Sequence, residues 1–268
     1  MNYQEICLAV VEIAKEAGSF IFNESKKTLT NEDIEIKGLH NYVTYVDKAA
    51  EKTIVEGLTK LLPESGFIAE EGTSDKKGVK YNWVIDPLDG TTNFIHRMPP
   101  FAVSIALMAD DEVVIGVIYE VNLKECFYTW KGAPSYLNGN EIKVSSAQKV
   151  QDSLIATGFP YYNFDKLAMF MNTMDFFMKK SHGLRRLGSA ATDLAYVACG
   201  RFEAFYEYSL SPWDVAAGAL LVQNAGGCVS DFSKGKNYIF GKEIIASNSN
   251  VYNEFAEVIH NLMKLGDK

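Results

Sequence analysis

Residues 83–94 read Trp-Val-Ile-Asp-Pro-Leu-Asp-Gly-Thr-Thr-Asn-Phe, and they carry the strongest structural signal in this chain of 268 residues. The apolar residues 83–85 predict a short buried strand that ends at the carboxylate of Asp86. Pro87 fixes φ and forces a change of direction, while Gly90 allows backbone angles that a Cβ would exclude. The sequence therefore predicts a buried strand that turns sharply at its acidic end.

The predicted turn offers oxygen ligands. It is expected to bring the carboxylates of Asp86 and Asp89 to one side, with the Leu88 carbonyl exposed between them. Such a hard, all-oxygen ligand set suits Mg²⁺ rather than Zn²⁺. The hydroxyls of Thr91 and Thr92 could orient a water molecule or a phosphate oxygen. An ordinary polar turn is the alternative, because Asp-Gly is a common turn dipeptide.

The run from Asp86 to Phe94 resembles the signature of the inositol monophosphatase family, whose members are Mg²⁺-dependent, Li⁺-sensitive phosphatases. A second similar run, Pro-Trp-Asp-Val-Ala-Ala-Gly at residues 212–218, lies far downstream, and the likeness covers nearly the whole chain. Residues 188–201 are similar to the bacterial branch. The resemblance implies an α/β fold, a layered αβαβα sandwich of the sugar-phosphatase type.

The resemblance also implies roles for individual residues. The ligands of two or three Mg²⁺ ions per subunit would be Glu70, Asp86, the Leu88 carbonyl, Asp89 and Asp214. The residues that contact substrate would be Gly90, Thr91, Gly188, Ser189, Ala190, Glu207 and Asp214, with Asp193 a further candidate. Glu70 would also contact the attacking water, and Asp47 would accept the hydroxyl proton of Thr91. Attack would be direct, because no Cys or Ser has the setting of a covalent phosphoryl acceptor.

Ordinary structural roles remain open for several of these residues. Asp47 and Asp214 fall in the first turns of predicted helices, where a carboxylate complements the helix dipole. Glu70 could belong to an exposed acidic turn. Lys37 lies in the polar segment 28–42, which we expect to be a loop and which corresponds to a flap in the family; a solvated surface charge is the alternative.

Apolar periodicity predicts the remaining elements. In the first half we expect two helices packed on a largely antiparallel sheet, with helices at 3–26 and 44–61 and strands at 101–108, 113–120 and 126–130. In the second half we expect strands at 154–157, 202–207, 228–231 and 244–246 and helices that begin near residues 190 and 212. A further helix carries an apolar stripe that should fill the core: Phe164, Leu167, Met171, Met174 and Met178.

This pattern divides the chain near residue 148. We expect an N-terminal α+β subdomain at 1–148 that carries most metal ligands. A C-terminal α/β subdomain at 149–268 would carry the substrate-orienting residues and Asp214.

Composition limits the partners. Hydrophobic residues at 47% and charged residues at 22% are typical of a soluble globular protein. The net charge of −8 argues against nucleic acid as the main partner. No apolar run approaches the ~20 residues of a membrane helix, and the N-terminus lacks a signal-peptide pattern, so we expect a cytoplasmic protein. An acidic protein can hold a phosphate dianion only if cations stand between them.

We therefore expect a Mg²⁺-dependent phosphatase that acts on myo-inositol monophosphate or a similar polyol or sugar phosphate. Relatives that hydrolyse phosphoadenosine phosphate typically read Lys-Glu-Phe where this chain has residues 92–94, Thr-Asn-Phe. That activity, fructose-1,6-bisphosphatase activity and a partner-binding regulatory role are the alternatives. The family implies a homodimer. Arg185 and Arg186 could serve a second phosphate, a dimer contact or simply the solvated surface.

Overall fold

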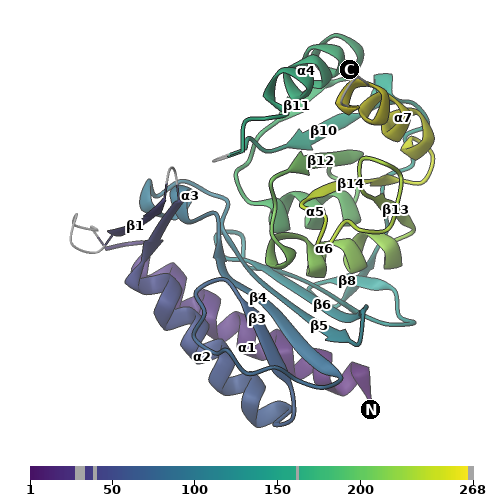
Figure 1. The fold of residues 1–268 in the computed structure, drawn as a ribbon. Helices are drawn as coiled ribbons and strands as arrows, with labels where there is room; N and C mark the ends of the chain where they lie inside the picture. Colours follow the sequence, from purple (N-terminus) through teal and green to yellow (C-terminus); the bar gives the residue numbers. More distant parts are fainter. Residues whose placement is uncertain (28–33, 39–40, 161–162, 265–268) are drawn as a thin grey trace.

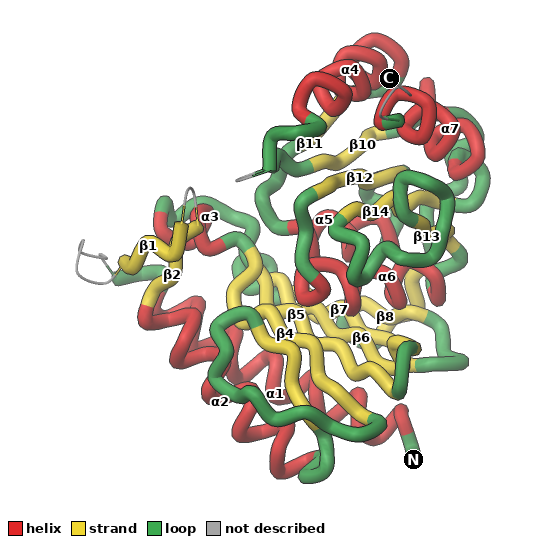
Figure 2. Tube along the Cα trace, viewed as in Figure 1, coloured by secondary structure: helices red, strands yellow, loops and turns green. Residues whose placement is uncertain are grey.

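The computed structural model describes residues 1–27, 34–38, 41–160 and 163–264. Helices and sheets alternate in five layers, which confirms the predicted sandwich (Figures 1 and 2). One outer layer contains α1 (Tyr3–Glu24) and α2 (Tyr45–Leu61), and the central layer contains α5 (Ala190–Ala198) and α6 (Pro212–Asn224). The other outer layer contains α4 (Leu167–Lys180) and α7 (Tyr252–Met263). The two sheets lie between these helical layers.

The first sheet has seven strands in the order β3-β4-β5-β6-β7-β8-β9. Their bounds are Gly66–Ala69, Tyr81–Asp89, Ala102–Ala109, Glu112–Glu120, Glu125–Trp130, Ser135–Leu137 and Asn140–Ile142. All neighbours are antiparallel except β3 and β4. The prediction of two helices on a largely antiparallel sheet is therefore confirmed. The pairing of β4 with β5 shifts register between Asp86 and Asp89, so the strand bends at its acidic end.

The second sheet has five strands in the order β11-β10-β12-β14-β13. Their bounds are Gly183–Arg185, Leu154–Thr157, Ala204–Tyr208, Glu243–Asn248 and Gly227–Ser230. Strand β10 runs parallel to both neighbours, and β14 runs antiparallel to both of its neighbours. Between the two sheets, one buried apolar cluster combines residues of both halves, including Val84, Phe127, Leu194 and Val215. The division predicted at residue 148 falls in the connection from β9 to β10, and we keep it as a proposal.

The segment 28–42 was predicted to be a loop, and this is wrong for its described part. Strands β1 (Ile34–Gly38) and β2 (Asn41–Thr44) pair as an antiparallel hairpin. The strands are short, so their alternation is too brief to give a periodic signal. Residues 28–33 and 39–40 and the side chain of Lys37 lie outside the described part of the chain.

Of the five residues of the apolar stripe predicted to fill the core at 164–178, Met174 is partly buried and packs against the core, but the other four are exposed. The exposed fractions are 45% for Phe164, 38% for Leu167, 50% for Met171 and 56% for Met178. The side chains of Phe170, Thr173 and Phe177 are buried instead. The two phenylalanine rings pack on Tyr206 of β12 at centroid distances of 5.5 Å. Because α4 is apolar on more than one face, packing against β12 and α7, rather than periodicity, selects the buried one.

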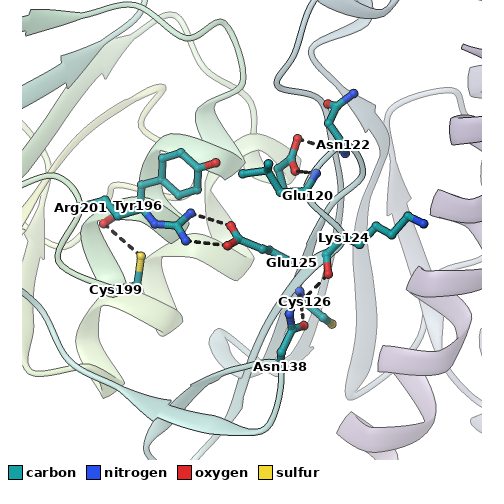
Figure 3. Close-up of polar contacts among 10 residues, drawn as sticks. Glu120, Asn122, Lys124, Glu125, Cys126, Asn138, Tyr196, Cys199 and Arg201 are labelled. Atoms are coloured by element: carbon teal, nitrogen blue, oxygen red, sulfur yellow. Dashed lines mark hydrogen bonds and ion pairs between the residues drawn. The ribbon is translucent and has the colours of Figure 1, made fainter.

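A polar contact joins the central helical layer to the first sheet (Figure 3). The guanidinium of Arg201, just after α5, donates two hydrogen bonds to the Glu125 carboxylate of β7, both at 2.5 Å. The same guanidinium lies 4.6 Å from the ring centroid of Tyr196. Such a bidentate pair fixes the direction of the contact as well as its distance.

Among the described residues, no helix is both long and apolar enough to cross a membrane.

Candidate active site

A cavity of about 240 Å³ lies where the end of β4 meets the starts of α5 and α6. Apart from the further candidate Asp193, its lining includes every residue that the sequence predicted as a metal ligand or substrate contact: Glu70, Asp86, Leu88, Asp89, Gly90, Thr91, Gly188, Ser189, Ala190, Glu207 and Asp214. Asp47 does not line the cavity, but it contacts Thr91, which does. Residues up to 144 positions apart are thus brought to one place, and their roles there remain predictions.

The bend at the end of β4 sets the positions of the first acids. The Leu88 amide donates to Asp86 Oδ1 at 2.9 Å, which closes a tight turn around the buried carboxylate. Gly90 follows with φ of +97° and precedes α3 (Thr91–Ile95). A Cβ at Gly90 would lie 3.1 Å from Pro100 O and 3.2 Å from Gly188 O. Glycine is therefore required both by the left-handed backbone and by the close approach of these carbonyls.

Three carboxylates from two halves of the chain converge beside this bend. One carboxylate oxygen from each of Asp86, Asp89 and Asp214 lies within 4.8 Å of the other two. Glu70 joins the group from the end of β3, because its carboxyl group shares a hydrogen bond with that of Asp86. The result is a cluster of four acids whose donors are all oxygen.

Burial and mutual repulsion disfavour the ionised forms of the four acids, so their pKa values are raised. Burial, reinforced by the charge of Asp214, raises the pKa of Glu70 to about 8. Burial and then the charge of Glu70 raise the pKa of Asp86 well above its usual range, and burial with Asp89 does the same for the pKa of Asp214. Burial also raises the pKa of Asp89, to about 6. Four acids that repel one another in a partly dry site favour either protons or bound cations.

Asp47 makes the contacts that both interpretations considered for it require. Its Oδ2 accepts hydrogen bonds from the amide of Thr44 at 2.8 Å and from the Thr44 hydroxyl at 2.6 Å, which completes a capping box at the start of α2. Its Oδ1 lies 3.0 Å from Thr91 Oγ1. The Thr91 hydroxyl is also 3.1 Å from the Leu88 carbonyl. A hydroxyl has one proton, so donation to Asp47 leaves the carbonyl oxygen available to another partner.

Asp214 likewise begins a helix and reaches the cavity. The amide of Ser211 donates to Asp214 Oδ2 at 2.7 Å, and Pro212 occupies the first helical position. This confirms the helix start predicted from Ser-Pro-Trp-Asp. The free oxygen of a capping carboxylate can serve a second purpose, and here Asp214 is also a member of the acid cluster.

The start of α5 contacts the acid cluster directly. Ser189 caps the helix, and its hydroxyl lies 2.7 Å from Asp89 Oδ2. The amide of Ala191 donates to the same oxygen at 2.7 Å. Asp89 therefore anchors the substrate-binding segment predicted at residues 188–190 to the end of β4.

Asn93 forms a second anchor that the sequence did not reveal as such. The side chain is buried, and its Nδ2 donates to Pro100 O and to Leu187 O, each at 2.8 Å. One amide group thus joins α3, the following loop and the segment before α5. The contact spans 94 positions, so no local pattern could have indicated it.

Glu207 forms the opposite wall. The residue is 7% exposed, and a Cβ at Gly158 would lie about 2.0 Å from Glu207 Oε1, so only glycine leaves room for the carboxylate. Burial raises the pKa of Glu207 to about 8, while the Arg186 guanidinium opposes the shift. Arg186 lines the cavity and lies 5.4 Å from the ring centroid of Phe159, whereas Arg185 is exposed.

Some lining residues were not predicted, and one candidate lies elsewhere. Phe159 and Ser209 line the cavity, and Ser209 has φ of +70°, an uncommon angle for a residue with a side chain. Nothing in their local sequence marks them as site residues. Asp193 is buried in the first turn of α5 and is not among the residues that line the cavity. Burial, with the charge of Glu207, raises its pKa.

Comparisons with known proteins agree with these features. The model of the inositol monophosphatase family matches residues 2–264. A protein of Pseudomonas aeruginosa named Nus factor SuhB is 42% identical over 244 residues, which cover 89% of this chain and 90% of that protein. The inositol monophosphatase of Dictyostelium discoideum is 39% identical over 256 residues, which cover 94% and 93%. The extragenic suppressor protein suhB of Bartonella henselae superposes with a TM-score of 0.89 at 36% identity, over 98% of this chain and 99% of that one.

Proposed function

The chain belongs to the inositol monophosphatase family, and on that premise we propose that it is a Mg²⁺-dependent phosphatase of myo-inositol monophosphate or a similar polyol or sugar phosphate. The observation that carries the proposal is the convergence of carboxylate oxygens of Asp86, Asp89 and Asp214 within 4.8 Å of one another, with Glu70 hydrogen-bonded to Asp86. A cluster of ionised carboxylates repels a phosphate dianion unless cations are bound between them.

The donor set fits Mg²⁺. It consists of carboxylates and the Leu88 carbonyl, which are hard oxygen ligands, and it offers no thiol or imidazole among the residues that line the cavity. Glu70, Asp86, Leu88, Asp89 and Asp214 would hold two or three ions. Bound Mg²⁺ would supply a water of lowered pKa and would offset negative charge on the phosphate oxygens.

The chain's own residues would direct the proton from that water. Asp47 holds the hydroxyl of Thr91 at 3.0 Å and is itself held by Thr44. A carboxylate that accepts this hydroxyl proton makes the Thr91 oxygen a better acceptor toward a water in the cavity. The Glu70 carboxylate would orient the same water from the other side. Replacement of Asp47, which is not a proposed metal ligand, should lower kcat rather than raise KM.

The opposite wall would bind the alcohol part of the substrate. The predicted contacts at Gly188, Ser189 and Ala190 and the carboxylate of Glu207 face the cavity from the second half of the chain. A carboxylate accepts hydrogen bonds from hydroxyl groups, which favours a polyol over an apolar alcohol. The Arg186 guanidinium offsets part of the negative charge of Glu207 on this wall.

The test is phosphate release by the purified protein from myo-inositol 1-phosphate, with and without Mg²⁺. Fructose 1,6-bisphosphate and phosphoadenosine phosphate are assayed in parallel. We expect Mg²⁺-dependent turnover with the highest kcat/KM for the inositol ester. A higher kcat/KM for another ester would contradict the substrate assignment but not the metal site.

A partner-binding role is the second candidate, because relatives that are 42% identical are named Nus factor SuhB. Failure to hydrolyse any of the three esters, in protein that still binds Mg²⁺, would favour this role. We also propose a cytoplasmic homodimer, as the family resemblance implies. Sedimentation of the purified protein tests the oligomeric state.

A further inference from the structure

Helix α2 carries two buried carboxylates one turn apart. Asp47 is 1% exposed and Glu51 is completely buried. Residues four apart lie on the same face of a helix, yet the two carboxylates bind different segments. Asp47 holds Thr91, as described above, whereas Glu51 binds the loop at residues 71–73, which follows β3.

Glu51 binds this loop through two backbone amides. Its Oε2 accepts from the amide of Glu71 at 2.8 Å, and its Oε1 accepts from the amide of Thr73 at 2.7 Å. Between them, Gly72 has φ of +68°. A left-handed residue lets the amides on both of its sides converge on one anion. The loop is therefore wrapped around a carboxylate that the protein itself supplies.

The same loop begins at Glu70, the acid that β3 contributes to the cluster. The amide of Glu70 donates to Ile85 O of β4 at 3.2 Å, so the residue is held on its N-terminal side. The next amide in the chain is held by Glu51. The Glu70 backbone thus lies between two anchors, and its carboxyl group meets that of Asp86.

We propose that Glu51 is a positioning residue, which holds the loop after β3 so that the Glu70 carboxylate reaches the acid cluster. A buried carboxylate is costly unless it is hydrogen-bonded, and both bonds of Glu51 go to the loop that presents Glu70. The inference rests on the proposed function only in that the cluster is taken to bind Mg²⁺. Loss of a group that orients a metal ligand typically lowers metal affinity or activity by about 10- to 100-fold.

The substitution Glu51→Gln tests this with little change of shape, because it places an amide NH₂ where one oxygen accepted a hydrogen bond. We expect faster hydrogen exchange at the amides of residues 71 and 73. We expect Mg²⁺ to bind about 10- to 100-fold more weakly in calorimetry. For myo-inositol 1-phosphate, kcat/KM at a fixed low Mg²⁺ concentration should fall and should recover as Mg²⁺ is raised.

Glu120 provides a matched control. It is 1% exposed and accepts from the amides of Asn122 at 3.2 Å and Leu123 at 2.5 Å, in a turn that carries no residue of the proposed site (Figure 3). Glu120→Gln should therefore speed exchange at its own turn and leave the affinity for Mg²⁺ unchanged. Equal Mg²⁺ affinities for Glu51→Gln and Glu120→Gln would overturn the proposal.

Gly72→Val decides the question if Glu51→Gln does not fold. Gly72 is exposed, and an added Cβ would meet no atom within 4 Å, so the variant disturbs only the backbone angle. A β-branched residue opposes φ of +68° and should displace the loop. We expect Mg²⁺ affinity to fall about tenfold, and unchanged affinity would overturn the proposal. Hydrogen exchange and Mg²⁺ calorimetry need no turnover, so they test the positioning role of Glu51 even if the protein hydrolyses none of the three esters.

Discussion

The buried acids on the two sides of the cavity have different charged neighbours. On the side formed by β3 and β4, burial raises the pKa values of Glu70 and Asp86, and the leading influences of their neighbours come from other acids. On the side formed by α5 and β12, burial raises the pKa of Glu207, but the first neighbour to act is Arg186, which opposes the shift. Glu70 and Asp86 thus face other acids, whereas Arg186 lies beside Glu207 and also lowers the pKa of Asp89.

This difference suggests a division of labour across the cavity. A side whose acids repel one another gains free energy when it binds cations from solution. A side whose charge is already moderated is better suited to hydroxyl groups, which carry no charge. The four predictions below test this contrast, beginning with the largest expected effect.

Asp89→Asn should abolish turnover and stabilise the metal-free protein at pH 8. The variant loses a proposed metal ligand, and it also removes a carboxylate whose pKa is raised to about 6 by burial. A shift of about two pKa units corresponds to a gain of up to about 3 kcal/mol. Phosphate release and thermal unfolding in EDTA measure the two effects. Turnover in this variant, or a clear loss of metal-free stability, would contradict the contrast between the two sides.

The metal-free protein should become less stable as pH rises from about 4 to 8. Glu70 and Asp89 have pKa values of about 8 and about 6, above their ordinary 4.5 and 3.8, so the folded state binds more protons than the unfolded state across this range. Their protonation stabilises the fold at low pH, and this contribution is lost as pH passes through the raised values. We expect a decrease on the order of several kcal/mol.

Chemical denaturation in EDTA at a series of pH values measures this decrease. Saturating Mg²⁺ should reduce or reverse it, because the cations replace the protons. A stability in EDTA that stays constant or rises with pH would contradict the prediction, because it would show that the pKa values of these acids are not raised in the folded state.

At a pH of about 9, above the raised pKa of Glu207, Glu207→Gln should raise KM for myo-inositol 1-phosphate about 10- to 100-fold, the value of one charged hydrogen bond. The change lies on the alcohol-binding side, so kcat and Mg²⁺ affinity should stay close to those of the wild type. Glu203→Gln is the control, because Glu203 binds the amide of Leu154 at 2.6 Å and is not among the residues that line the cavity. A fall in kcat with KM unchanged would place Glu207 in the chemical step instead.

Glu125→Gln should have the smallest effect, a loss of about 0.5–1 kcal/mol of stability with kcat and KM unchanged. Glu125 pairs with Arg201 away from the cavity, and the Arg201 side chain is 39% exposed. Thermal unfolding, with an expected decrease of about 1–4 °C, and steady-state kinetics provide the measurements. A change in KM would show that this contact between layers also adjusts the cavity.

The contrast between α2 and α4 explains which parts of the fold were predictable. Helix α2 has a single apolar face and a capping residue, Thr44, so both its start and its buried side follow from the sequence. Helix α4 is apolar on several faces, and most of the stripe predicted to be buried is exposed. Periodicity identifies a buried face only when the opposite face is polar.

The acids of β4 were recognisable because they are close together in the chain. Asp86, Leu88 and Asp89 are separated by few bonds, so a strand and a turn are enough to bring them together. The anchors around them were not recognisable. Asn93 bonds to Leu187, and Glu51 bonds to Glu71 and Thr73, across connections that only the folded chain closes.

By itself, the sequence determined the family, the layered fold, the helix starts at Asp47 and Asp214 and the acidic bend after β4, since each depends on local backbone chemistry or on a contiguous motif. Only the tertiary structure decided which face of α4 is buried, which acids lie near the Arg186 guanidinium and which buried groups hold the loops in place. These depend on contacts between segments far apart in the chain, where packing and desolvation act on all partners at once.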